Sequence, residues 1–283
     1  MEPVYVNKVC YIGDYGVESA AVYLCGIMAH YGIDYEQISS VDRVPQDFKT
    51  RCYSLYIISD YPRSGFNEGD LEHIARCVRE EGSGLLMLGG WESYHGQNGE
   101  YNKTALADVL PVTMLNEDDR RCSAVGILLT DNDVNHPIID GLPWAWPPMI
   151  VGYNEFVPKK GAEVLLNGFS YEIRILNDNI EEVIPETPHD PGKFFAERVT
   201  IPTITGDSVA LRPLERIPML VVGTCGKGRV TAFASDVAPH WVGGLVDWGK
   251  ERVYQEVGTG SIEVGADYTV FFRNMVKWTG KIV

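Results

Sequence analysis

The sequence is poor in basic charge. Its 283 residues include 24 Lys and Arg against 39 Asp and Glu, which gives a formal net charge of −15. Affinity for nucleic acid comes largely from lysine and arginine side chains that neutralise phosphates. We therefore expect no nucleic-acid partner. The acidic balance is interpreted as a source of solubility through self-repulsion.

Long apolar runs are also missing. No stretch approaches the ~20 apolar residues needed to span a bilayer. The N-terminal "MEPVYVNKVCYIGDYG" does not combine a basic region, an apolar stretch and a small-residue cleavage site. The sequence therefore predicts a cytoplasmic protein with no membrane partner.

The cysteines form no C-x-x-C pair. Scattered cysteines in a chain of this size favour neither a disulfide framework nor a zinc site. We assign no metal ligand and no cofactor from the sequence. Three cysteines fall in apolar-periodic segments and are expected in the core, namely Cys10, Cys25 and Cys77.

The first half of the chain alternates strand and helix patterns. Apolar strands are expected at residues 8–13, 33–38, 53–59 and 85–90. Residues 17–31 carry apolar side chains at helical spacing. Asn67, with Asp70 three residues later, predicts the capped start of a second helix. This alternation indicates βαβ units, and hence a parallel sheet flanked by helices.

The second half changes character, although we expect one domain over residues 1–283. Short strands separated by Pro- and Gly-rich turns are expected after residue 125, and "TCGKG" predicts a β-hairpin. Apolar spacing predicts a closing helix that starts near Asp267. Residues 168–216 contain the acidic "NDNIEEVIPETPHDPG" and are interpreted as an added insertion loop or small β-rich subdomain.

Polar side chains follow four of the expected strands. In open parallel sheets, ligands bind at the carboxyl ends of the strands, so these clusters should converge on one crevice. Each aspartate could equally be a helix cap or turn former. The clusters are Asp14 with Tyr15, Asp60 with Tyr61, Glu92 with Ser93, and Asp236 with His240 and Trp241.

His240 is the histidine most suited to acid–base chemistry, because it follows a strand and neighbours Asp236. A purely structural hydrogen bond would explain it about as well. His95 is expected to be exposed, and His136 to fix a turn. Cys225 has no base near it in sequence and is not a candidate nucleophile. The charged run "NEDDRR" at residues 116–121 is interpreted as a solvated face.

With these residues in view, the chain resembles the class I glutamine amidotransferase-like superfamily. It is most similar to an uncharacterised branch related to trehalose-utilisation-type domains. The resemblance implies a flavodoxin-like fold with its site at the strand ends, and it covers nearly the whole chain outside residues 168–216. The matching stretches are "LYIISDYP", "GLLMLGGWESYHG", "DVLPV", "EDDR", "HPIIDGL", "GYNEF", "KKGAEVLL", "GTCGKGRVTAFASDVAPHW" and "VKWTGK".

True amidotransferases of this class carry a nucleophilic cysteine in a G-x-C-x-G elbow, paired with a histidine and a glutamate. Aligning "GGWES" with that elbow puts Trp91 at the cysteine position. Tryptophan has no nucleophilic atom, and the covalent mechanism needs an activated thiolate. Ser93 could replace the thiol only if His240 lay within hydrogen-bond reach. The resemblance therefore supports the fold more than the activity.

Three functions follow from this comparison. The first is a small polar ligand, such as a sugar or an amide, bound without glutaminase chemistry; aromatic rings beside carboxylates suit a polyol. The second is a hydrolase that uses Glu92, Ser93 or Asp236 with His240, with or without a metal ion. The third and least favoured is a true amidotransferase. A homo-oligomer is also expected, with "GLPWAWPPM" covering partner surfaces. The side chains assigned to the ligand are Asp14, Tyr15, Asp60, Tyr61, Trp91, Tyr94 and Trp241.

Overall fold

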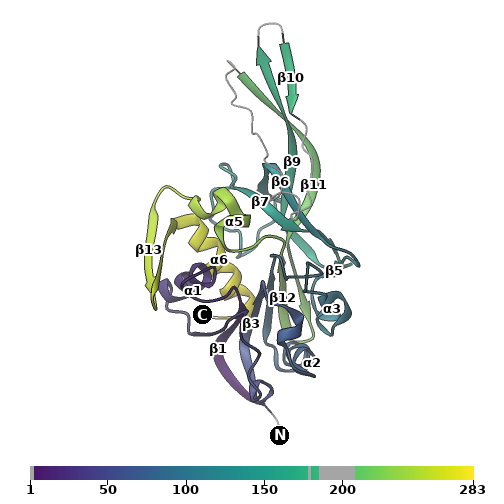
Figure 1. The fold of residues 1–283 in the computed structure, drawn as a ribbon, viewed down its shortest axis with the longest axis vertical. Coiled ribbons are helices and arrows are strands. Elements are labelled where there is room, and N and C mark those ends of the chain that lie inside the picture. The colour runs from purple at the N-terminus through teal and green to yellow at the C-terminus, as the bar shows by residue number, and fades with distance from the viewer. Residues whose placement is uncertain (1–2, 178–179, 185–207) are drawn as a thin grey trace.

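The computed structural model describes residues 3–177, 180–184 and 208–283 (Figure 1). Its main sheet contains five parallel strands in the order β2-β1-β3-β4-β12. This arrangement confirms the predicted flavodoxin-like fold. The bounds are β1 Val4–Gly13, β2 Tyr35–Ile38, β3 Arg51–Ser59, β4 Gly84–Leu88 and β12 Gly228–Phe233.

The parallel strands are covered on both faces by helices. Figure 1 shows α1 (Ala21–His30) and α6 (Ala266–Gly280) on one side, and α2 (Asp70–Arg76) and α3 (Leu106–Val109) on the other. Burial on both faces explains why β3 and β4 read as continuous apolar runs rather than as alternating ones. None of the described helices is long and apolar enough to cross a membrane.

The predicted closing helix is confirmed. It begins at Ala266 and buries a stripe of residues at helical spacing. The second predicted helix begins at Asp70 rather than at an Asn67 cap. Asp70 Oδ2 accepts a hydrogen bond from the Asn67 N–H (2.7 Å), while the Asn67 side chain donates to the Val44 carbonyl. The buried residues of the α6 stripe include Tyr268, Phe271, Phe272, Met275 and Val276.

Antiparallel strands extend the sheet beyond β12. The predicted hairpin is present, because β11 (Ser208–Cys225) turns into β12 through "TCGKG". The order continues through β9 (Glu163–Asn177), β6 (Arg120–Asp131) and β7 (Met149–Asn154), and β10 (Ile180–Ile184) pairs with β9. The far ends of β9, β10 and β11 project from the body of the molecule (Figure 1). Within the expected insertion, residues 178–179 and 185–207 lie outside the described residues, and a separate subdomain there stays a prediction.

Two small sheets and several short turns complete the described chain. One sheet pairs β5 (Val112–Met114) with β8 (Phe156–Pro158), and the other pairs β13 (Arg252–Val257) with β14 (Gly260–Gly265). The short helix α5 (Pro239–Val242) follows β12. A π-helical turn, Cys77–Glu81, continues α2, and 3₁₀ turns lie at Phe48–Thr50, Arg63–Gly65, Tyr101–Lys103 and Gly243–Asp247.

The structure contains a disulfide that the cysteine spacing did not predict. Cys52 in β3 is bonded to Cys77 at the end of α2, with the two Cα atoms 5.9 Å apart. The prediction of no disulfide was therefore wrong. The two cysteines are 25 residues apart in sequence, and only the packing of α2 against β3 brings them together. Cys10 and Cys25 are buried in the core, as expected.

Candidate functional site

A cavity of about 590 Å³ lies where the carboxyl ends of the parallel strands meet. Its position agrees with the rule for open α/β sheets. Six of the residues assigned to the site from the sequence line it. The lining consists of Asp14, Tyr15, Ser19, Ala20, Tyr23, Asp60, Trp91, Glu92, Gln97, Ala238, Pro239 and His240.

The backbone at these strand ends adopts conformations that ordinary residues rarely take. Asp14, Tyr15 and Asp60 have φ angles of 58°, 57° and 45°. Such conformations persist only where the surroundings enforce them, and they concentrate at functional sites. Gly90 has φ 152°, and a Cβ added there would lie 2.4 Å from Asp60 Oδ1. A glycine at position 90 therefore makes room for the Asp60 carboxylate.

Two carboxyl groups, those of Asp14 and Asp60, line the cavity, and that of Asp236 lies within 4.8 Å of the Asp60 carboxyl group. Asp14 is 1% exposed and Asp236 is fully buried. The Tyr11 hydroxyl donates to Asp14 Oδ2. Asp236 Oδ1 accepts hydrogen bonds from the backbone N–H groups of Val237 (2.5 Å) and Ala238 (3.2 Å).

These carboxyl groups raise one another's pKa values. Burial, followed by the charge of Asp14, raises the pKa of Asp60 to about 8. The pKa of Asp14 is raised by burial and then by Asp236, and that of Asp236 by burial and then by Asp60. Burial and a like charge both disfavour the ionised form. The cluster is therefore poised to hold protons or a cation at neutral pH.

His240 lies at the edge of this cluster, on α5. Its Nε2 atom is 3.2 Å from Asp236 Oδ2, and its side chain is 43% exposed. Burial lowers the pKa of the imidazole. A neutral imidazole beside a carboxyl group can accept a proton or bind a metal ion. The two residues, close in sequence, are thus also close in the fold.

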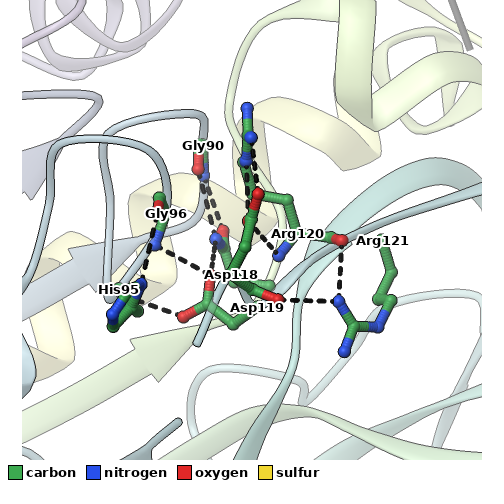
Figure 2. Close-up of polar contacts among 8 residues, drawn as sticks. Gly90, His95, Gly96, Asp118, Asp119, Arg120 and Arg121 are labelled. Atoms are coloured by element: carbon green, nitrogen blue, oxygen red, sulfur yellow. Dashed lines mark hydrogen bonds and ion pairs between the residues drawn. The ribbon is translucent and has the colours of Figure 1, made fainter. Parts of the chain in front are cut away.

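The turn after β4 is fixed by Asp119, which precedes β6. Figure 2 shows its carboxylate accepting hydrogen bonds from the backbone N–H groups of His95 (2.8 Å) and Gly96 (3.1 Å). The Asn154 side chain donates to Asp119 Oδ1 (2.8 Å), and its Oδ1 accepts from the Gly90 N–H (2.8 Å). Asp119 and Asn154 thus hold the cavity-facing turn from the antiparallel half of the sheet.

Sequence reasoning missed these two residues. The run 116–121 was interpreted as a solvated face, which is wrong for Asp119 because it is fully buried. The available signal was the matching stretches "EDDR" and "GYNEF", which contain Asp119 and Asn154. Neither stretch, taken alone, indicates that its residue forms hydrogen bonds with the turn after β4.

Trp91 is held in place by Asp118 and Arg120, the two neighbours of Asp119 in sequence. The Arg120 guanidinium lies 4.6 Å from the centre of the Trp91 ring. Asp118 in turn holds that guanidinium with two hydrogen bonds, from Nε (2.8 Å) and from Nη2 (2.6 Å). A cation over an indole face is attractive. The ring that lines the cavity is therefore positioned rather than loose.

Five residues assigned to the site, Asp236 among them, do not line the cavity, because their side chains are fully or almost fully buried. The Ser93 hydroxyl oxygen accepts a hydrogen bond from the Asp60 N–H (3.0 Å). Tyr61 donates to the Asp42 carbonyl (2.8 Å), and Tyr94 to the Met87 carbonyl (2.9 Å). Trp241 packs against Gly152. The expected polar, aromatic rim therefore consists of fewer residues, and Ser93 is not placed to meet a ligand.

No cysteine is among the residues that line the cavity. Cys10, Cys25 and Cys122 are buried. Cys225 precedes β12, so it lies at the amino end of the parallel strands, opposite the cavity. In the part of the chain that the structure describes, the cavity therefore offers no thiol to a ligand.

Comparison with known proteins identifies a matching family and similar folds. A family model, GATase1_like, described as "Putative glutamine amidotransferase", matches residues 18–170 and 197–257. Cytoplasmic Protein STM1381 from Salmonella typhimurium LT2 has a similar structure, with a TM-score of 0.65 and 26% identity over 96% of this chain and 99% of its own. Cytoplasmic Protein STM3548 from Salmonella typhimurium has a TM-score of 0.66 and 22% identity over 96% and 98%. No curated protein matches the sequence.

Proposed function

The chain belongs to the GATase1-like family of glutamine amidotransferase-like proteins, and from that membership we propose that it binds a small polar ligand, such as a sugar or an amide, without hydrolysing glutamine. One observation carries the proposal. Trp91 lines the cavity and stands directly after the glycine pair that follows β4, the position that the resemblance assigns to the nucleophile of amidotransferases of this class. Covalent glutaminase chemistry requires a thiolate at this point.

The cavity lining suits a ligand with several hydroxyl or amide groups. The carboxyl groups of Asp60 and Glu92 can form hydrogen bonds, and the Trp91 and Tyr15 rings offer flat apolar faces. Glu92 is oriented by a hydrogen bond from Asn98 (2.9 Å). Ligand sites commonly combine apolar walls with a few fixed polar groups, and aromatic rings beside polar groups are suited to sugars.

Thermal denaturation of the purified chain with a panel of sugars and amides tests the proposal. A ligand that binds only the folded state, at about a hundred times its dissociation constant, raises stability by about 2.7 kcal/mol. For a chain of this size we expect a rise of roughly 5 °C in Tm. Trp91→Ala should abolish the rise, whereas Trp146→Ala, remote from the cavity lining, should not. Release of glutamate from glutamine by the wild type would overturn the proposal.

A second function, hydrolysis, is favoured by the 3.2 Å approach of His240 to Asp236. In this reaction His240 would exchange a proton with a water or leaving group, with Glu92 as the other cavity acid. Ser93 contributes no nucleophile, since it is fully buried. Turnover of esters, amides or glycosides that is lost in His240→Ala would support hydrolysis over binding alone.

We also propose that the protein is a cytoplasmic homo-oligomer. Trp146 in the "GLPWAWPPM" segment is 78% exposed, beside a second cavity of about 680 Å³ that Trp248 also lines. Large exposed apolar side chains beside a hollow are typical of contact surfaces. Light scattering should give a multiple of the 31.5 kDa chain mass, and Trp146→Ser should lower it. A monomeric wild type would contradict this.

A further inference from the structure

We propose that Asp60, Asp236 and His240 form a binding site for a divalent transition-metal ion of the Zn²⁺ class at the floor of the cavity. The inference shares the cavity with the proposed ligand but does not depend on the ligand's identity.

The three side chains already place suitable donor atoms together. One carboxylate oxygen each from Asp60 and Asp236 and one imidazole nitrogen of His240 lie within 4.8 Å of one another. An ion with bonds of about 2.1 Å holds its donors roughly 3 to 4 Å apart. Small rotations of these side chains would therefore bring all three donor atoms to bonding distance from one ion. The three residues follow β3, β12 and the start of α5, so the sheet fixes their spacing.

Buried oxygens in this cluster lack partners. Asp236 is fully buried, and its Oδ2 atom accepts no hydrogen bond, although His240 Nε2 lies 3.2 Å away. Asp14, which is 1% exposed and lines the same cavity, has an Oδ1 atom that is also without a partner. Unsatisfied buried acceptors are uncommon and destabilising. A bound cation would be coordinated directly by Asp236 Oδ2. It would also stabilise the ionised carboxyl group of Asp14 by electrostatic attraction.

Basic side chains do not offset the acidic cluster. In the described ranges, no lysine or arginine forms an ion pair with Asp14, Asp60 or Asp236. Buried carboxylates are normally paired or coordinate metal ions. The cluster has the charge of a cation site and lacks the side chains of an internal salt bridge.

The donor set indicates which ion would bind. Ca²⁺ and Mg²⁺ prefer oxygen ligands alone, whereas imidazole suits Zn²⁺ and its neighbours. Two carboxylates and one imidazole give three protein ligands, the number found in catalytic zinc sites that keep a position open. Asp60 and His240 line the cavity, so the open position would face a water or the polar group of a ligand.

Metal titration of the full chain tests the inference. The protein, stripped with EDTA and kept free of reductant, is titrated with Zn²⁺, Mn²⁺, Mg²⁺ and Ca²⁺ by calorimetry, and bound metal is counted after dialysis. We expect one Zn²⁺ per chain and weaker binding of Mg²⁺ and Ca²⁺. His240→Ala, Asp60→Asn and Asp236→Asn should each weaken Zn²⁺ binding at least about tenfold, since even outer partners of a metal site contribute that much.

Matched variants keep the result interpretable. His240 is 43% exposed, so its alanine variant should fold, and circular dichroism checks each protein. His95→Ala should bind Zn²⁺ normally. A second cluster, Cys52, His73 and Cys77, also brings donor atoms together. Its two cysteines are joined in a disulfide and offer no thiolate, so a Cys52→Ser/Cys77→Ser protein should bind Zn²⁺ as the wild type does.

Absence of Zn²⁺ and Mn²⁺ binding, or binding that persists in the His240 and Asp236 variants, would overturn the inference. Loss of binding in the cysteine variant alone would also overturn it. No organic ligand is present in the titration. The titration therefore tests the metal site separately from the proposed function. If the protein binds a sugar or an amide but no metal ion, the proposed function stands and the metal site is contradicted.

Discussion

His240 Nε2 lies 3.2 Å from Asp236 Oδ2 across the turn that joins β12 to α5. The three residues between them in sequence form a short link from a buried carboxyl group to an imidazole that lines the cavity. Asp236 is fixed from behind by two backbone N–H groups. A proton or a metal ion shared by this pair would therefore be held by the fixed Asp236 carboxyl group, with the more exposed His240 side chain toward the ligand.

Asp119→Ala should destabilise the protein and weaken ligand binding together. The substitution leaves the N–H groups of His95 and Gly96 and the Asn154 amide without their shared acceptor. Each unsatisfied buried group costs about 1–3 kcal/mol, so we expect a loss of several kcal/mol in urea unfolding. Asp108→Ala, at a less buried position on α3, is the control and should change little. Equal effects of the two substitutions would contradict a special role for Asp119.

Gly90→Ala should displace the Asp60 carboxylate. The new Cβ would lie 2.4 Å from Asp60 Oδ1, and the residue would have to keep φ near 152°. Gly161→Ala is the matched control, because its φ is also positive (87°) and no atom lies within 4 Å of its added Cβ. Both should lose about 1 kcal/mol from the backbone, measured by thermal unfolding. Only Gly90→Ala should also lose Zn²⁺ affinity, and equal affinity in both would argue against the role given to Gly90.

His136 should make stability fall in mild acid. Its Nδ1 accepts a hydrogen bond from the Ile138 N–H (3.2 Å), and its ring lies 4.6 Å from that of Trp278. Burial lowers its pKa below the ordinary 6.5, with Arg229 acting in the same direction and Glu163 opposing. The folded state thus holds fewer protons than the unfolded state near that pH, and the stabilisation present above pH 6.5 is lost as pH falls below it.

The measurement is urea unfolding of the wild type and of His136→Asn between neutral and mildly acidic pH. Asparagine can present an oxygen to the Ile138 N–H but does not titrate. As the pH falls, the unfolding free energy of the wild type should decrease more than that of His136→Asn. A difference that is independent of pH would show that His136 titrates alike in both states.

Removal of the disulfide should lower stability without affecting the cavity. In the chain-entropy description, a bond that closes a loop of 25 residues contributes roughly 3 kcal/mol. Cys52→Ser/Cys77→Ser should therefore unfold at lower urea concentration, and reduction of the wild type should produce a similar change. Thiol counting by mass spectrometry before and after reduction checks that the bond is present. An unchanged midpoint after reduction would contradict its stabilising role.

The sequence predicted the parallel half of the fold well because its signal is local. Continuous apolar strands followed by helical spacing indicate buried βαβ units, and the strand ends then locate the cavity. Side-chain direction after each strand was less predictable. Tyr94 has φ 50° and its hydroxyl reaches the Met87 carbonyl beneath the turn, a path that alternation along a strand does not reveal.

Contacts between residues far apart in sequence were also not predicted. Asp119 and Asn154 bond to backbone groups near residues 90–96, and Cys52 pairs with Cys77 through helix packing. Single-sequence patterns extend over one element and contain no information on such pairs. The same holds for Trp91 and Arg120, whose stacking brings the first residue of β6 to the turn after β4.

The insertion of β12 beside β4 has a consequence for how the protein is made. Phe233 pairs with Leu88, so the strand that delivers Asp236 and His240 leaves the ribosome long after its neighbour. The first four parallel strands must wait with one edge uncovered, and contacts of such large sequence separation slow folding. Chaperone demand during synthesis should therefore centre on the exposed edge of β4, and the cavity is among the last features that the new chain acquires.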